Sequence, residues 1–493
     1  MNISISQLSQ QLDQRIAELK KHRPEAQKSR TIIDNALTDG NTYYGINTGF
    51  GILANKRVSQ EGLEQLQSNL LKSHAVGVGP LIPKEICALM LKLKIHALGL
   101  GYSGVSDSTL ERLIYFAEHK LIPSAPSKGS LGASGDLAPL AHLFLPLLAL
   151  GEFWDEKGTA TIPAEEILKK HNLEPVILHP KDGLALINGT QFMLAYGVFV
   201  LNKCLRLLDY ADLIAAMSLE ALQGSIKPFD PRIHDIRPHK GQRFVAANVR
   251  KLLEESEILE SHRNCGKVQD PYCLRCVPQV HGATRDALDY VVNVLETEMN
   301  SVTDNPLVFE NGDILSGGNF HGQPLALALD FAAIALAELG SISERRTYLL
   351  LEGEDGLPTL LMRETGINSG FMIPQYTSAA LVSENKVLCH PASVDSIPSS
   401  LGQEDHVSMG SISATKLLTV FENLEHILAI ELFTAAQALD FRMPLKPGRG
   451  VQKAHQYVRK IVPHNETDKL LKEDMNACYE IIRDGKLHDL VFG

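Results

Sequence analysis

A glycine-rich segment near residue 130 contains a serine, and the residues on either side of it determine which reactions it can take part in. The segment reads Gly132-Ala133-Ser134-Gly135-Asp136. A serine nucleophile on a strand-to-helix elbow needs the spacing G-x-S-x-G, and Gly135 follows Ser134 directly, which argues against a serine hydrolase. A tight bend would instead let the amide nitrogen of Gly135 attack the carbonyl carbon of Ala133, because glycine has no Cβ to block the approach. Loss of two waters would then leave an electrophilic imidazolone with an exocyclic methylidene; a plain turn is the simpler alternative.

Further polar, glycine-rich segments lie between apolar stretches of the chain. They occupy residues 42–51, 188–191, 269–272 and 403–406. Loops on a rigid helical scaffold are common positions for catalytic and binding residues. Each segment is therefore a candidate part of a site.

Residues 129–142, Gly-Ser-Leu-Gly-Ala-Ser-Gly-Asp-Leu-Ala-Pro-Leu-Ala-His, closely resemble the signature of the aromatic amino acid ammonia-lyases. Further motifs of that family follow in its order from Tyr44 to about Met409. The resemblance implies that Ala133, Ser134 and Gly135 form 4-methylidene-imidazol-5-one autocatalytically, with no external cofactor. It also implies an ammonia-lyase/fumarase-like helical architecture.

The same resemblance assigns roles to a tyrosine and an arginine. Tyr44, in Tyr-Gly-Ile-Asn-Thr-Gly-Phe-Gly, matches the catalytic base. Arg275, in Val-Gln-Asp-Pro-Tyr-Cys-Leu-Arg-Cys, matches the residue that binds the substrate carboxylate, and a guanidinium pairs well with a carboxylate through two parallel hydrogen bonds. Without their motifs, packing and surface roles would be the simpler interpretations of the two residues.

Four more residues match positions around the electrophile. Asn188 resembles a second contact for the substrate's carboxylate and amine, whereas Gln269 and Tyr272 resemble residues near the electrophile. Phe320, in Ser-Gly-Gly-Asn-Phe-His-Gly-Gln-Pro, resembles an aromatic wall of the site. We expect all four to take part in catalysis or substrate binding.

Two positions bear on the substrate's ring. Ser73-His74 and Glu404 resemble the residues of the histidine-specific enzymes in this family rather than those of the tyrosine and phenylalanine enzymes. The imidazole of His74 and the carboxylate of Glu404 can hydrogen-bond an imidazole ring, and a carboxylate in a pocket requires a cationic or hydrogen-donating partner. The resemblance implies elimination of ammonia from L-histidine to give trans-urocanate, as in histidine degradation. Alternatives within the family are a tyrosine or phenylalanine ammonia-lyase or an aminomutase.

A different class of function is suggested by cysteines near Arg275. Cys273-x-x-Cys276 is preceded by Cys265 and flanked by His262 and His281, and such residues suit zinc. No second cysteine pair follows at the spacing of a zinc finger, so we expect no metal site. The alternative to an enzyme is a non-catalytic helical scaffold or a zinc-binding protein.

Composition and charge exclude several classes. The 493 residues are 44% hydrophobic, and the formal net charge is −11, without a basic block. We therefore expect neither nucleic acid nor membrane as a partner. Seven cysteines without a recognisable export signal are typical of reduced thiols, which favours the cytoplasm.

The apolar spacing predicts a mainly α protein with a large central helical bundle and a loop-rich N-terminal catalytic part. Helices are expected over 137–150, 191–223, 287–299, 324–339 and 417–432. Short strands are expected at 185–187 and 307–309. Parts 1–225 and 226–493 are expected to form one continuous unit, and the resemblance implies a homotetramer whose active sites combine several subunits.

Overall fold

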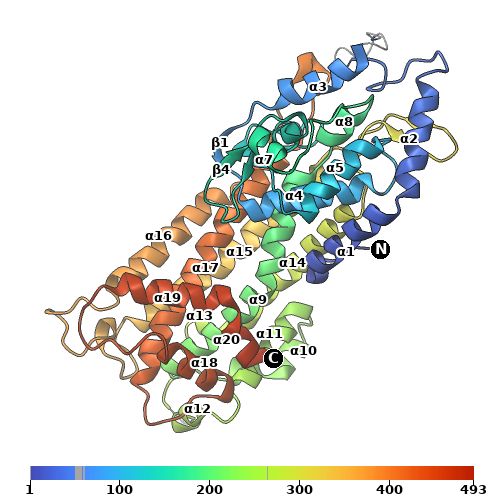
Figure 1. Ribbon diagram of the computed structural model, residues 1–493. Coiled ribbons are helices and arrows are strands. Elements are labelled where there is room, and N and C mark those ends of the chain that lie inside the picture. Colours follow the sequence, from blue (N-terminus) through green and yellow to red (C-terminus); the bar gives the residue numbers. More distant parts are fainter. Residues whose placement is uncertain (1, 50–57, 59–61, 264) are drawn as a thin grey trace. The chain divides into compact units, whose positions relative to one another are not determined.

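The computed structural model describes residues 2–49, 58, 62–263 and 265–493. The described chain is mainly helical (Figure 1). It divides into two compact units. Unit 1 comprises Met1–Asn202, Val292–Asp330 and Pro391–Thr415, and unit 2 comprises Lys203–Val291, Phe331–His390 and Lys416–Gly493. The predicted mainly α class is confirmed, whereas the predicted division at residue 225 stays a prediction.

Four long helices contain four of the five sequence boundaries between the two units; the fifth, between His390 and Pro391, follows α16 (Met372–Leu388). The four long helices are α9 (Gln191–Ala221), α14 (Val277–Met299), α15 (Gln323–Leu350) and α17 (Gly410–Asp440). Each overlaps one of the helices predicted from apolar periodicity, although α9 ends two residues before the predicted helix 191–223. Much of α9 and α15 is buried, although both are long and apolar enough to cross a membrane by length and composition.

Unit 1 adds short helices and three two-stranded antiparallel sheets. Its helices are α1 (Leu8–Lys21), α2 (Pro24–Ala36), α3 (Leu63–His74), α4 (Lys84–Leu98), α5 (Asp107–Glu118), α6 (Leu137–Phe144), α7 (Ala164–Lys170) and α8 (Asp182–Ile187), with 3-10 turns at Ile5–Gln7, Leu145–Leu148 and Ser400–Gly402. The sheets pair β1 (Val78–Leu81) with β2 (Pro126–Lys128), β3 (Glu152–Trp154) with β4 (Thr161–Pro163), and β5 (Leu307–Val308) with β6 (Ile314–Leu315).

One predicted strand of unit 1 is wrong and another is confirmed. Residues 185–187 belong to helix α8, whose six residues are all buried. A short apolar run that is covered all round carries no periodicity that separates a strand from a helix. The strand expected near residue 307 is β5.

In its described residues, unit 2 consists of segments of the four long helices and of eight shorter helices. They are α10 (Pro231–Asp235), α11 (Lys240–Leu252), α12 (Glu257–Ser261), α13 (Tyr272–Arg275), α16 (Met372–Leu388), α18 (Arg449–Arg459), α19 (Leu471–Asp484) and α20 (Lys486–Phe492), with 3-10 turns at Lys227–Phe229 and Thr359–Leu361. Within this unit α15, α16 and α17 lie side by side (Figure 1).

A buried ion pair connects the long helices in the core of unit 2. Arg346 of α15 binds Glu431 of α17 through two hydrogen bonds of 2.6 and 2.8 Å. Ser218 of α9 and Ser343 of α15 also donate to this carboxylate, at 2.7 and 2.6 Å. A buried pair is tolerated when its polar atoms are satisfied in this way. The cluster fixes the relative register of α9, α15 and α17 in this unit.

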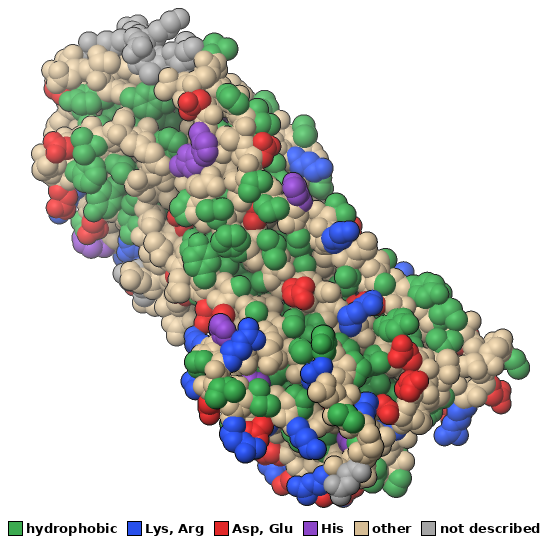
Figure 2. Space-filling view, turned by 180° about the vertical axis from the view of Figure 1, so that it is seen from behind, with side chains coloured by type: hydrophobic (Ala, Val, Ile, Leu, Met, Phe, Trp, Pro, Cys, Tyr) green, Lys and Arg blue, Asp and Glu red, His purple; other side chains and the backbone are tan. Residues whose placement is uncertain are grey.

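The drawn surface mixes the two signs of charge. Figure 2 shows basic, acidic and hydrophobic side chains interspersed over the face that it draws. This agrees with the absence of a basic block from the sequence.

Candidate active site

A cavity of about 700 Å³ in unit 1 brings together many of the predicted residues. It is lined by Tyr44, Ser73, His74, Ser134, Asn188, Phe320 and Glu404, among others. These residues come from α3, from the start and end of short helices, and from loops that are far apart in the sequence. The structure thus places the reactive-serine segment beside both residues predicted to read the substrate's ring.

The segment before Ser134 is fixed to the start of α17. The amide of Met409 donates to the carbonyl of Leu131 at 3.0 Å, and the Oγ of Ser411 donates to the carbonyl of Ser130 at 2.6 Å. The segment after Ser134 is fixed to a different loop. The amide of Asp136 donates to the carbonyl oxygen of Gly189 at 2.7 Å. The Ala-Ser-Gly tripeptide is therefore anchored on both sides.

Two glycines allow the chain to bend at this position. Gly132 and Gly135 have φ values of +75° and +76°, a region that other residues rarely adopt. A Cβ on Gly132 would lie 2.2 Å from the Oγ of Ser408, and one on Gly135 would lie 2.1 Å from the carbonyl oxygen of Gly189. A bend at positive φ, with no Cβ on Gly135 to block the approach of its amide to Ala133, favours backbone cyclisation, so the residues present fit the predicted prosthetic group.

Asp136, the residue after the tripeptide, connects this bend to helix α9. Its Oδ2 accepts hydrogen bonds from the amides of Phe192 and Met193, both at 3.1 Å, at the first turn of α9. Burial raises the pKa of Asp136 to about 7. The carboxyl group thus ties the end of the tripeptide to the start of a long, buried helix.

Glu404 lies at the serine itself. The Oγ of Ser134 donates to Oε1 of Glu404 at 3.1 Å, and the Oγ of Ser399 donates to Oε2 at 2.8 Å. The backbone amide of Ser399 also donates to the carbonyl of Glu404 at 2.9 Å. Ser399 therefore holds the carboxylate in place, and no sequence motif had indicated this residue.

His74 presents a neutral imidazole to the cavity. Its Nδ1 lies 2.8 Å from the carbonyl oxygen of Leu70, an acceptor, and 3.0 Å from the Oγ of Ser73, so Nδ1 is the donor and, in the neutral ring, Nε2 carries the lone pair. Burial lowers the pKa of His74 from 6.5, against the opposite effect of the Glu404 charge. Leu66, Asn69 and Leu70 line the cavity from the preceding turns of α3. Helical spacing from Ser73 could have indicated these additional lining residues.

Asn188 offers an acceptor to a positively charged group. Its Nδ2 donates to Oδ1 of Asp304 at 3.3 Å and to the carbonyl of Asn305 at 3.1 Å. Its buried Oδ1 has no hydrogen-bond partner among the residues that the structure describes. Such an atom is costly unless a ligand supplies a donor. A substrate ammonium group in the cavity would satisfy it.

Tyr44 and Phe320 complete the predicted wall of the cavity. Both are half-buried. Tyr44 lies in a turn where the amide of Gly45 donates to the Oγ1 of Thr48 at 3.1 Å. The last two residues of its motif, 50 and 51, lie outside the described residues.

Gln269, Tyr272 and Arg275 belong to unit 2. Arg275 stacks its guanidinium on the ring of Tyr272, with 4.5 Å to the ring centroid, and 70% of Tyr272 is exposed. The four-residue helix α13 brings these two side chains together. The roles of all three residues stay predictions.

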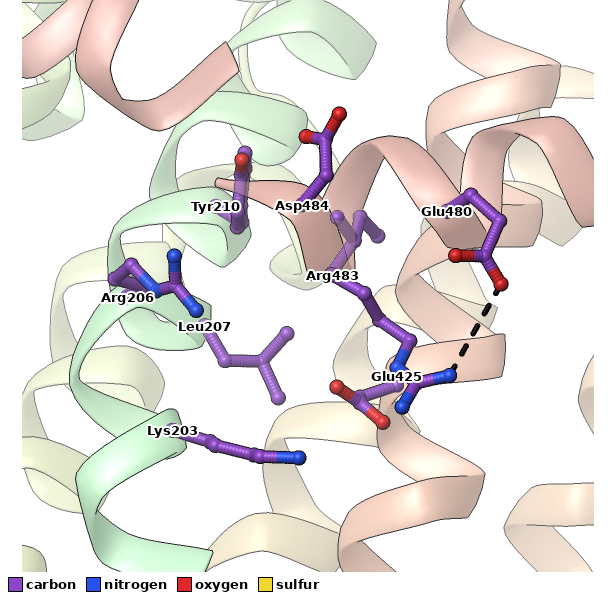
Figure 3. A pocket seen from close by; sticks show the side chains of 9 residues that line it. Lys203, Arg206, Leu207, Tyr210, Glu425, Glu480, Arg483 and Asp484 are labelled. Atoms are coloured by element: carbon purple, nitrogen blue, oxygen red, sulfur yellow. Dashed lines mark ion pairs between the residues drawn. The ribbon is translucent and has the colours of Figure 1, made fainter. Parts of the chain in front are cut away.

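Unit 2 contains another cavity, of about 290 Å³, that includes none of the predicted residues. Figure 3 shows Lys203 and Arg206 of α9 on one side and Glu425 of α17 on another, with Arg483 of α19 pointing toward Glu480. Burial raises the pKa of Glu425 to about 6. Cations and carboxylates are mixed in this lining, so it favours neither an anionic nor a cationic ligand.

The cysteines near Arg275 are free thiols in the structure. Cys265 is exposed, and Cys273 and Cys276 are partly buried. The described residues contain no group of three or more histidine, cysteine, aspartate or glutamate side chains arranged to hold a metal ion.

Known proteins resemble this chain over nearly its whole length. The sequence model of the aromatic amino acid lyases matches residues 3–460. The chain is 52% identical over 474 residues to a histidine ammonia-lyase of Anaeromyxobacter dehalogenans, covering 94% of this chain and 93% of the relative. A crystal structure of histidine ammonia-lyase from Trypanosoma cruzi aligns with a TM-score of 0.88 and 40% identity, over 97% of this chain and 92% of that one. Tyrosine aminomutase from Streptomyces globisporus aligns with a TM-score of 0.90 and 34% identity, over 100% and 98% of the two chains.

These matches, together with the helical fold, identify the class as a carbon–nitrogen lyase with an ammonia-lyase fold. The chain belongs to the aromatic amino acid lyase family.

Proposed function

We propose that this chain eliminates ammonia from L-histidine and releases trans-urocanate. The observation that carries the proposal is that the His74 imidazole and the Glu404 carboxylate both line the cavity that contains Ser134. Acceptors suit an imidazole, whose neutral ring carries one N–H donor and whose protonated ring carries two, and a phenyl ring would leave them unpaired. The relatives named histidine ammonia-lyase support the same substrate.

The proposed prosthetic group is 4-methylidene-imidazol-5-one, formed from Ala133, Ser134 and Gly135 without an external cofactor. Its electrophilic carbon would supply the activation that the poor leaving ability of an amino group requires. The anchored tripeptide and the two glycines at positive φ support its formation here.

The chain's own side chains position the substrate and move its proton. Tyr44 acts as the base that removes the β-proton, and Asn188 Oδ1 accepts a hydrogen bond from the substrate's ammonium. Phe320 packs on the substrate from the cavity wall. Glu404 and His74 hold the imidazole ring.

Three residues of unit 2 complete the proposed machinery. Arg275 binds the substrate carboxylate through its guanidinium, and Gln269 and Tyr272 lie near the electrophile.

We propose that the active enzyme is a homotetramer in which different copies of the chain contribute residues to each site. The partly exposed side chains of Phe331, Tyr348, Ile373 and Tyr376 in unit 2 offer apolar surface for such contacts. Location in the cytoplasm stays a prediction.

An amino acid with a benzenoid ring is the second candidate substrate. The likeness to tyrosine aminomutase favours it, and it would make the chain a tyrosine or phenylalanine ammonia-lyase or an aminomutase. The polar pair His74 and Glu404 argues against this alternative, because apolar residues suit a benzenoid ring better.

Product analysis with three substrates tests the proposal. The purified protein is incubated separately with L-histidine, L-tyrosine and L-phenylalanine, and products are identified by mass spectrometry. We expect urocanate and ammonia from histidine at the highest kcat/KM. A higher kcat/KM for either of the other amino acids, or a β-amino acid as the main product, would overturn the substrate assignment.

Mixed tetramers test the shared site. Ser134→Ala and Arg275→Ala are each expected to be nearly inactive alone. If one site uses both residues from different copies, unfolding and refolding the two variants together should restore part of the activity. No recovery, with tetramers formed, would contradict the proposed sharing.

A further inference from the structure

A buried lysine in unit 1 contacts the loop that anchors the reactive tripeptide. Lys94 lies on α4 and is only 2% exposed. Its Nζ donates to the carbonyl oxygen of Asn188 at 2.5 Å. Within the described part of the chain, this oxygen is the ammonium's one hydrogen-bond partner.

Keeping a cation at this position is costly. A buried ammonium loses its hydration, and a neutral side chain of similar length would avoid that penalty. Burial lowers the pKa of Lys94 to about 7, while the charges of Asp304 and Asp136 raise it and that of Lys181 lowers it. Packing alone therefore gives no reason for a lysine here. The contact that distinguishes it from a methionine is the hydrogen bond to Asn188.

The Asn188 carbonyl is directly connected to the tripeptide's anchor. Gly189, the next residue, accepts from the amide of Asp136 at 2.7 Å and donates to the carbonyl of Ser134 at 3.4 Å. The Asn188 side chain is held separately by Asp304 and Asn305. Lys94 thus holds the peptide plane between Asn188 and Gly189, whose N–H donates to the carbonyl of Ser134. The next peptide plane presents the Gly189 carbonyl that accepts from Asp136, so both bonds to the tripeptide's segment depend on where Gly189 lies.

We propose that Lys94 is a positioning residue for formation of the prosthetic group: its bond to the Asn188 carbonyl holds Gly189 where it keeps the Ala133-Ser134-Gly135 bend closed. This inference rests on the proposed function, because it concerns the group proposed there. Lys94 itself forms no bond to the tripeptide and exchanges no proton in this account.

The test measures ring formation separately from activity. Intact-mass spectrometry follows the fraction of freshly synthesised, folded chain that has lost two waters, in the parent protein, Lys94→Met and Lys92→Met. Lys92 lies on the same helix, is mostly buried and forms an ion pair with Asp13, so it controls for loss of a lysine on α4. Circular dichroism and thermal unfolding identify the folded fraction.

We expect Lys94→Met to fold, with a midpoint of unfolding at or above that of Lys92→Met, yet to lose the two waters about 10-fold more slowly or worse. Lys92→Met should match the parent. Equal rates in Lys94→Met and the parent would overturn the inference while leaving the proposed function intact. A parent chain without the two-water deficit would overturn the proposed function, and this inference with it.

A second variant keeps the inference testable if Lys94→Met does not fold. Lys94→Gln keeps a donor that can reach a carbonyl but carries no charge, and we expect it to mature at a rate between those of the parent and Lys94→Met. If both neutral variants fail to fold while Lys92→Met folds, Lys94 acts in general folding and the positioning role is wrong.

Discussion

The hydroxyl of Ser134 donates a hydrogen bond to Oε1 of Glu404 over 3.1 Å, although 270 residues separate the two in the sequence. The other carboxylate oxygen is fixed by Ser399. In the proposed mature protein Ser134 has lost this hydroxyl, so Oε1 becomes available to an N–H donor of the substrate. One carboxylate thus contacts the reactive serine before maturation and the substrate ring afterwards.

Replacing Glu404 by glutamine should impair the reaction without preventing maturation. The amide keeps the size of the side chain and loses its charge, and hydrogen bonds to a charged group are worth about 1.5–3 kcal/mol. We therefore expect kcat/KM for L-histidine to fall roughly 10- to 100-fold in Glu404→Gln, with the two-water mass deficit kept. Glu310→Gln, at an exposed glutamate, serves as the control. Unchanged kinetics in Glu404→Gln would contradict the role given to the carboxylate.

Replacing His74 by leucine should change the preference between substrates. The variant loses the Nε2 acceptor and gains apolar surface in the cavity. We expect kcat/KM to fall about 10-fold or more for L-histidine and to rise for L-phenylalanine relative to histidine. Steady-state assays with both amino acids measure the ratio. The same ratio in the parent and in His74→Leu would show that His74 does not contact the ring.

Adding a methyl group at Gly189 should disturb the anchor of the tripeptide. This residue has a φ of +121°, and a Cβ there would lie 2.6 Å from Oε1 of Gln191 and 2.8 Å from Oγ1 of Thr303. We expect Gly189→Ala to lower the free energy of unfolding by about 1–3 kcal/mol and to slow the loss of two waters. At Gly318 a Cβ would meet nothing within 4 Å, so Gly318→Ala is the matched control. Normal maturation of Gly189→Ala would argue against the anchor.

The pH dependence of stability should reveal the buried carboxyl group of Glu220 in unit 2. Burial raises the pKa of Glu220 from 4.5 to about 7, against the opposing effects of hydrogen bonds from Ser256 and Gly448. Between these two values the folded chain holds a proton that the unfolded chain has released. The contribution of Glu220 to the free energy of unfolding therefore falls as pH rises from about 4.5 to about 7, by about 3 kcal/mol at most.

Glu220→Gln removes this titration. Its midpoint of thermal unfolding, relative to that of the parent, should therefore rise between pH 5 and pH 8. Calorimetry of both proteins over that range provides the comparison. A difference that is flat, or that falls with rising pH, would contradict the raised pKa.

The long helices and the main cavity residues followed from sequence, because each carries a local signal. Apolar spacing of three and four residues predicted α9 and α17, and a local motif marked Ser134, His74 and Glu404. Helix α8 was misjudged because its side chains are buried on every side and show no alternation. Lys94 and Ser399 carry no local signal, since a lysine in an amphipathic pattern predicts an exposed face and a serine in a loop is ordinary. Their roles arise only from contacts across the fold.

The mass of the intact chain tests the central claim most directly. The account predicts that the purified parent protein lacks two waters relative to its sequence, whereas Ser134→Ala has its full calculated mass, keeps the parent's circular dichroism, and loses the near-ultraviolet absorbance and nearly all lyase activity. A parent chain of full mass, or a Ser134→Ala variant with full activity, would contradict the conversion of Ala133, Ser134 and Gly135 into the electrophile.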